Sequence, residues 1–194
     1  MKAALPALLA AATIGGCDDN TLGTYRVDKI TIVDGAEVER LMQPLYRDHP
    51  FPEFRVELST DTDIVHVGRG QTVYMWGDFC PFRDEHSLSI TPMFPDGEPP
   101  FPGEADGHAR RARRDAAGRY HYVVYIDPRG YRAAGNADYD LRTDTRDLCL
   151  RAKGTFMFPP HSAVVVIPHS RIAPLLPELV RRTDALRLPP LVAK

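Results

Sequence analysis

Beyond residue 24, the chain is dominated by short runs in which apolar and polar residues alternate or β-branched residues cluster. The first run, residues 25–33, carries Val27, Ile30 and Ile32, a composition typical of a strand. Because closely spaced short strands with turns between them are typical of antiparallel architectures, the pattern predicts a mainly β single domain, either a β-sandwich or a barrel-like sheet. The other expected strands are residues 54–58, 63–67, 72–76, 87–91, 119–126, 147–158 and 163–167.

Two segments show helical spacing instead. Between residues 36 and 47, apolar positions recur at i, i+3, i+4 and i+7, which predicts a short helix near the N-terminus that Pro44 shortens or bends. Near the C-terminus, Ser170 is a candidate N-cap of a second short helix. The apolar residues of this second helix are Ile172, Leu175, Leu176, Leu179 and Val180.

Residues 92–118 follow neither period, since they begin with a proline-rich stretch and continue with a cluster of arginines. A loop of this length inside a compact domain is uncommon and is usually functional or disordered. Guanidinium groups match the geometry of phosphate and carboxylate, which makes the cluster a candidate binding surface. The alternative is a solvated loop whose arginines pair with nearby acids. The clustered residues are Arg110, Arg111, Arg113 and Arg114.

Composition narrows the class of protein. The chain has 194 residues, enough for one domain with a sizeable core. Its formal net charge of −2 excludes a generally cationic nucleic-acid binder, so no nucleic-acid partner is expected. Its 18 prolines and 14 glycines argue against a helical bundle.

The N-terminus has the pattern of a targeting segment. Lys2 precedes residues 3–14, which are almost entirely apolar. This stretch is shorter than the about 20 apolar residues that span a bilayer, but it is typical of the hydrophobic region of a secretory signal peptide. A simple secretory signal would be cleaved at an Ala-x-Ala site such as residues 10–12. The alternative cleavage lies at Cys17, which follows two small residues.

The residues Ile14-Gly15-Gly16-Cys17 resemble the lipobox of bacterial lipoproteins, in which an aliphatic residue and two small residues precede a cysteine. The resemblance implies a signal peptide over residues 1–16. It implies that Cys17 becomes the first mature residue, carrying a thioether-linked diacylglycerol and an N-acyl chain such as palmitate. Several acyl chains hold a protein on a membrane far more firmly than one.

The same resemblance implies an organisation and a location. Residues 17–24 would be a lipidated tether, and residues 25–194 the β-rich domain, anchored in the bacterial cell envelope and facing the periplasm. Asp18, directly after the cysteine, resembles the inner-membrane retention signal of enteric lipoproteins, which favours that membrane.

The cysteine count also bears on whether Cys17 carries a lipid. The chain has three cysteines, and an odd count in an exported protein needs an explanation. If Cys17 carries lipid, Cys80 and Cys149 remain, and in an oxidising compartment they are expected to form a disulfide. A metal pair or a reactive thiol is the alternative, although there is no CxxC and no Cys/His cluster with ligand spacing.

The sequence holds no signature of catalysis: GxSxG, SxxK, HExxH and a glycine-rich phosphate loop are all absent. We therefore expect no catalytic residues, no cofactor and no bound metal. The leading hypothesis is a non-catalytic binding, scaffold or inhibitor role in the periplasm, with an envelope protein as a candidate partner. The oligomeric state is left open.

Two other hypotheses stay open. One is an envelope hydrolase, possibly metal-assisted, that uses His66 or His121 with neighbouring acids, because carboxylate and imidazole suit divalent ions. It requires convergence among Asp61, Asp63, His66, Asp84, His86 and His121. The other is a small immunity or lysozyme-inhibitor lipoprotein, which size and location permit.

Overall fold

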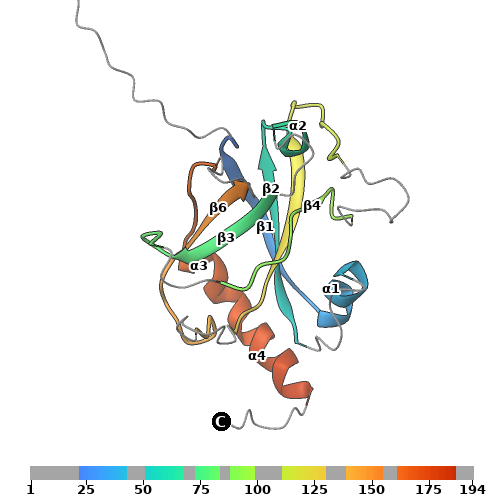
Figure 1. The fold of residues 1–194 in the computed structure, drawn as a ribbon. Helices are drawn as coiled ribbons and strands as arrows, with labels where there is room; N and C mark the ends of the chain where they lie inside the picture. The colour runs from blue at the N-terminus through green and yellow to red at the C-terminus, as the bar shows by residue number, and fades with distance from the viewer. Residues whose placement is uncertain are drawn as a thin grey trace, which may run out of the picture.

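The structure, a computed structural model, describes residues 22–42, 51–67, 73–83, 88–98, 111–129, 139–154 and 161–186. Its strands form two antiparallel sheets, of strand order β1-β2-β5-β4 and β3-β6-β7 (Figure 1). The expected mainly β fold is confirmed, and the described strands close no barrel. The strands are β1 (Tyr25–Val33), β2 (Glu53–Thr60), β3 (Val73–Phe79), β4 (Phe94–Pro95), β5 (Tyr120–Ile126), β6 (Leu148–Gly154) and β7 (Val165–Ile167).

One hydrophobic core draws on alternate residues of both sheets. Val56 of β2 pairs directly with Val124 of β5, and Met75 of β3 pairs with Ala152 of β6, so each pair points to one face of its sheet. Burying a large apolar side chain contributes about 1.5–3 kcal/mol. The core residues of the four central strands are Phe54, Val56, Leu58, Val73, Met75, Phe79, Tyr122, Val124, Ile126, Leu148, Leu150 and Ala152.

A smaller apolar cluster lies on the other face of the four-stranded sheet. There the helix α1 (Gly35–Met42) places Val38 and Met42 against Val123 and Tyr125 of β5. Phe94 of β4 joins them, with its ring centroid 5.5 Å from that of Tyr125 and the planes at 82°. Edge-to-face contacts of this kind stabilise aromatic pairs beyond their burial. Figure 1 shows α1 beside this sheet, away from β3 and β6.

The segment from Leu88 to Thr91 connects the two sheets. The Leu88 N–H donates to the carbonyl of Gly77 in β3 at 3.0 Å, and the Thr91 N–H donates to the carbonyl of Tyr125 in β5 at 3.0 Å. Residues 87–91 were expected to form a strand. Ser87 lies outside the described residues, and the rest contributes a single bridge, Ile90 with Ile126. The segment divides its hydrogen bonds between two sheets, so it extends neither.

A bulge interrupts the edge strand β1. The register with β2 shifts between Val27 and Lys29, which leaves Asp28 without a partner residue. Arg171 lies in the short helix α3 (His169–Ile172). Its guanidinium donates to the carbonyls of Val27 at 2.9 Å and Asp28 at 3.4 Å. A side chain from a distant part of the sequence thus donates to the backbone carbonyls at the bulge.

Residues 63–67 were expected to form a strand, and this was wrong. Ile64–Val67 form the four-residue helix α2. Asp63 Oδ1 accepts the N–H of His66 at 3.2 Å, as an N-capping carboxylate does. The alternating apolar pattern favoured a strand, but this local cap stabilises a helical turn.

The loop and the C-terminal helix also differ from expectation. Phe94–Pro95, inside the expected loop 92–118, pair with β5 as the strand β4. Ser170 does not cap α3, because the helix begins after Pro168, and the Asp147 carboxylate accepts the N–H of His169 at 2.7 Å. The helix then passes through a 3-10 turn, Ala173–Leu175, before α4 (Leu176–Ala185), because Pro174 and Pro177 lack the N–H that a continuous helix needs.

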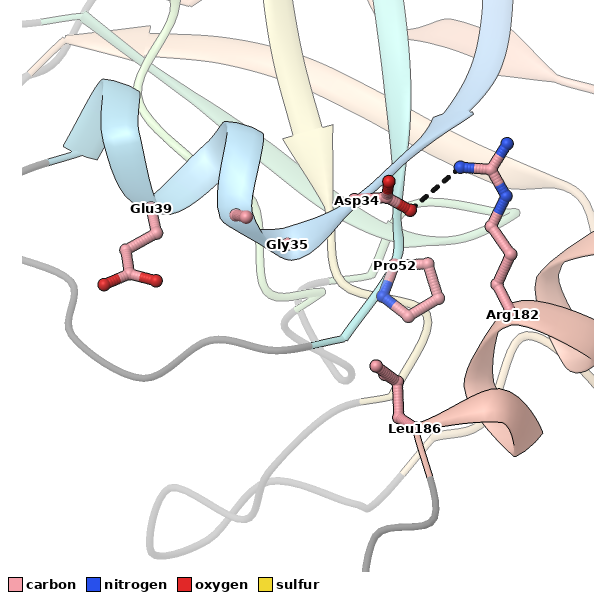
Figure 2. A pocket seen from close by; sticks show the side chains of 7 residues that line it. Asp34, Gly35, Glu39, Pro52, Arg182 and Leu186 are labelled. Atoms are coloured by element: carbon pink, nitrogen blue, oxygen red, sulfur yellow. Dashed lines mark hydrogen bonds and ion pairs between the residues drawn. The ribbon is translucent and has the colours of Figure 1, made fainter.

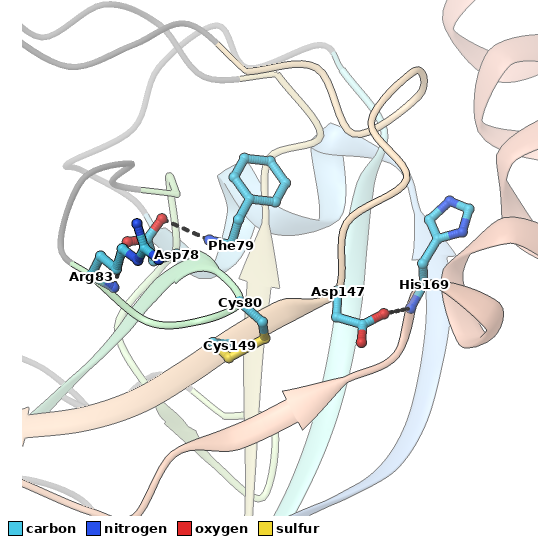
Figure 3. Close-up of a disulfide and its surroundings, with 7 residues drawn as sticks. All are labelled: Asp78, Phe79, Cys80, Arg83, Asp147, Cys149 and His169. Carbon is cyan, nitrogen blue, oxygen red and sulfur yellow. Dashed lines mark hydrogen bonds between the residues drawn. A yellow bond between two sulfur atoms is a disulfide. The ribbon is translucent and has the colours of Figure 1, made fainter.

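The expected disulfide joins Cys80 and Cys149, with the Cα atoms 5.1 Å apart (Figure 3). Cys80 directly follows β3, and Cys149 lies in β6 opposite Asp78. Next to the bridge, the Asp78 carboxylate accepts the backbone N–H groups of Phe79 at 2.7 Å and Arg83 at 3.1 Å. The disulfide therefore fixes the segment after β3 to the neighbouring strand.

Replacing Cys80 and Cys149 together with alanine should lower the free energy of unfolding by about 4 kcal/mol, because the unfolded chain loses a crosslink that spans 69 residues. Urea unfolding followed by circular dichroism measures this. A reductant should lower the free energy of unfolding of the unsubstituted chain by a similar amount and leave that of the variant unchanged. Equal unfolding curves with and without the crosslink would contradict the prediction.

A side chain at Gly23 should destabilise the fold. Its φ is 74°, and an added Cβ would lie 2.1 Å from Oγ1 of Thr62. Gly23→Ala should therefore lower the free energy of unfolding by about 1–3 kcal/mol, from backbone strain and overpacking together. Gly118→Ala is the control, because Gly118 has a φ of 81° but its Cβ would meet only the guanidinium of Arg114. An equal loss in the two variants would show that the contact with Thr62 has no effect.

Candidate binding surface

The lipidation candidate Cys17 and one of the clustered arginines, Arg110, lie outside the described residues. The described chain begins at Leu22, whose N–H donates to the carbonyl of His161 at 3.3 Å. The carbonyl of Gly23 accepts the N–H of Ala163 at 3.1 Å. The chain thus enters the fold beside the segment that leads into β7.

Two of the predicted binding arginines have partners within the chain. The backbone N–H of Arg113 donates to the carboxylate of Asp96 at 2.9 Å, and its guanidinium lies 3.8 Å from the same group. Arg114 donates to the carbonyl of Gly118 at 2.9 Å and lies over the ring of Tyr120. Arg111 is exposed. Arg113 and Arg114 are thus held against neighbouring turns by contacts within the chain.

A histidine between two carboxylates lies on the outer face of the four-stranded sheet. Nε2 of His121 is 2.7 Å from Asp115, and Nδ1 is 3.8 Å from Asp28. The Arg119 N–H donates to Asp115 at 2.8 Å. This backbone hydrogen bond, followed by the contact with His121, holds the pKa of Asp115 below its usual value of 3.8.

Ser59 is the cross-strand partner of His121, which brings serine, histidine and aspartate together on one sheet. The arrangement differs from a catalytic triad in two respects. Both ring nitrogens of His121 face carboxylates, which leaves neither directed at the serine. Oγ of Ser59 instead accepts from the guanidinium of Arg119 at 2.8 and 3.1 Å, and Ser59 is fully buried.

The other acids and the two other histidines of the hydrolase hypothesis lie elsewhere or outside the described residues. Asp61, Asp63 and His66 surround α2, where Asp63 is the cap of that turn. Asp84 and His86 lie outside the described residues. Across the ranges that the structure describes, no three His, Cys, Asp or Glu side chains are grouped as a metal site would require.

A pocket of about 350 Å³ lies where α1 begins, beside α4 (Figure 2). Two of its charged side chains, Arg182 and Asp34, form an ion pair with each other. Arg182 donates to Asp34 at 2.9 Å and to Glu178 at 2.7 Å, while Pro52 and Leu186 form the apolar wall. The pocket therefore lies between α1 and α4, and the ion pair of Arg182 with Asp34 crosses it.

The outer face of the three-stranded sheet has a different character, because large apolar side chains remain exposed there. Tyr74 is 38% exposed, Trp76 43% and Val166 47%. Tyr74 pairs with Lys153 and Trp76 pairs with Arg151, so these four side chains share one face. Val166 is opposite Cys149 on the same face. We call this set the aromatic–cationic face: Tyr74, Trp76, Arg151, Lys153 and Val166.

The two cations of this face are directed at rings. Lys153 Nζ is 4.9 Å from the ring centroid of Trp76, and the Arg151 guanidinium is 5.1 Å from that of Phe82. Such contacts are weakly favourable and leave the positive charge uncompensated. Among the described residues, no carboxylate lies within ion-pair distance of Arg151 or Lys153, and Nε of Arg151 is buried without a hydrogen-bond partner. The face therefore carries free positive charge next to exposed aromatic surface.

No family model, curated protein or solved structure matches this chain. Of the helices that the structure describes, none is both long and apolar enough to cross a membrane. The function is therefore inferred from the geometry of the described residues and from the N-terminal motif.

The sequence pattern reveals only part of the aromatic–cationic face. The alternation in β3 does predict that Tyr74 and Trp76 share a side. It does not reveal which strand lies beside β3, so the contribution of Arg151 and Lys153 depended on a register that only the fold provides.

The pKa of Asp115 leads to a prediction about acid sensitivity. A carboxyl whose pKa is lowered in the folded state adds stability above its unfolded pKa, and that stability is lost as the pH falls through the folded value. Asp115→Asn should therefore lower the free energy of unfolding at pH 7, and the deficit should shrink below pH 3.8. Urea unfolding across this range measures the difference. Asp184→Asn, at an exposed position of α4, is the control, and a deficit for Asp115→Asn that does not change with pH would contradict the prediction.

Proposed function

We propose that this chain is an exported bacterial lipoprotein, anchored in a membrane of the cell envelope through Cys17, that acts by binding and not by catalysis. The domain would face the periplasm. Its binding surface would be the aromatic–cationic face, whose exposed rings and free cations suit an anionic partner.

The pairing of Cys80 with Cys149 is the observation that carries the anchor. The chain has three cysteines, so this pair leaves Cys17 as the single remaining one, at the position where a lipobox carries its lipid. Disulfides persist in exported proteins and are rare in the bacterial cytosol. The pairing in the domain and the motif at the N-terminus thus support the same compartment.

Two observations favour binding over hydrolysis. His121 is held between Asp115 and Asp28, and Oγ of Ser59 is occupied by Arg119, so this cluster has the character of an ion-pair network. The pocket beside α1 is crossed by the ion pair of Arg182 with Asp34. The aromatic–cationic face, by contrast, keeps its rings partly exposed, and its two cations have no carboxylate partner among the described residues.

Expression of the full chain in a bacterium that processes lipoproteins tests the anchor. The intact non-reducing mass of the membrane-bound protein should correspond to a chain that begins at Cys17, carries its acyl groups, and is two hydrogens lighter because of the disulfide. Cys17→Ser should remove the acyl mass and lose membrane retention.

The control is a double substitution, Cys80→Ser with Cys149→Ser, which should keep the acyl groups and lose only the disulfide. If the isolated chain began elsewhere and carried no lipid, the proposed anchor would be wrong. Acylation that also vanished in the double variant would show that the effect of Cys17→Ser is not specific to that position.

A further inference from the structure

We propose that the aromatic–cationic face docks on anionic lipid headgroups of the membrane in which the chain is anchored. This inference deepens the proposed function and rests on its anchor at Cys17. The occupant of the face is then a lipid surface, and the tether determines which side of the domain reaches it.

The length of the tether is the first argument. Only residues 18–21 separate Cys17 from Leu22, which is fully buried at the start of the described fold. Fully extended, this stretch covers at most about 18 Å. An acylated Cys17 therefore holds the domain close to the headgroups, and one side of it must lie against them.

The position of Leu22 is the second argument. Its N–H donates to the carbonyl of His161, and His161 forms a bridge with Lys153. Lys153 in turn pairs with Tyr74. The chain thus enters the fold at the end of the row that contains Lys153 and Tyr74, so the short tether keeps this edge of the three-stranded sheet near the bilayer.

The chemistry of the face is the third argument. Tryptophan and tyrosine are enriched where a protein meets the headgroup region, because their rings are apolar and their N–H or O–H groups are polar. Trp76 and Tyr74 are both partly exposed on this face, and Val166 adds apolar surface beside them. Arg151 and Lys153 have no carboxylate partner among the described residues, so phosphate groups are suitable partners for them.

The net charge of the chain also bears on which side of the domain faces the membrane. The full sequence has a formal net charge of −2, so the chain as a whole is not drawn to an anionic membrane and attraction depends on locally cationic surface. A face with two uncompensated cations is attracted instead. Because the anchor already holds the domain at the surface, a small preference of this kind decides which side turns inward.

Trp76 is the only tryptophan in the chain, so intrinsic fluorescence reports on this face directly. The full chain, expressed with its own N-terminus and purified in detergent, is reconstituted into vesicles of phosphatidylcholine, or of phosphatidylcholine mixed with phosphatidylglycerol. In the anionic vesicles, the Trp76 emission should shift to shorter wavelength and acrylamide should quench it less. High salt should reverse both changes.

Lys153→Gln should weaken the docking roughly five-fold, the effect of about one basic residue at an anionic membrane. This is measured as the fraction of protected Trp76 against phosphatidylglycerol content, with each variant compared to itself in neutral vesicles. The matched control is Lys29→Gln, at an exposed position of β1 in the other sheet, which should leave the curve unchanged.

The outcomes separate this inference from the anchor. If the intact mass shows an acylated Cys17 but Trp76 is quenched equally in both kinds of vesicle, docking on lipid is overturned and the face is left for a protein partner. If the emission shift depends on protein concentration and not on lipid charge, a second copy covers the face and the inference is again overturned. If Cys17 carries no lipid, the anchor is wrong, and the comparison of the two vesicle compositions still decides whether the face binds anionic lipid.

Discussion

Alternate burial along the paired strands β3 and β6 is the constraint on which the rest of the structure depends. Because side chains in a strand point alternately to opposite faces, placing Met75 and Ala152 in the shared core forces Trp76 and Lys153 outward. A slip of one residue would bury the lysine and expose the core. The aromatic–cationic face is therefore fixed by the same packing that stabilises the domain.

The sequence was informative where one local force dominates. Alternating and β-branched runs identified most strands, because half-buried sheets demand that period. The alternating pattern gave a wrong prediction where a short-range contact outweighed it. Residues 63–67 were expected to be a strand, but Asp63 caps the helical turn α2. The sequence was also insufficient where the partner is distant in sequence. The carboxylate of Asp147 at the start of α3 and the pairing of Phe94 with Val123 depend on tertiary geometry.

The same distinction between local patterns and contacts distant in sequence applies to the candidate sites. The pairing of Cys80 with Cys149 was predictable because counting three cysteines leaves few arrangements. The neighbours of His121 were not, since Asp28 lies at the bulge in β1 and Asp115 lies in a turn before β5. Side chains that meet across strands require a known register, and neither periodicity nor composition supplies one.

Arg171 has a consequence for how copies of this domain coexist. An exposed edge strand such as β1 offers its carbonyls to any strand that approaches, and sheets can grow from one molecule to the next in this way. The guanidinium of Arg171 already occupies the carbonyls of Val27 and Asp28, at the bulge where β1 bends. Neighbouring copies of the domain therefore meet an edge at which these two acceptors are already taken, which disfavours polymerisation along this strand.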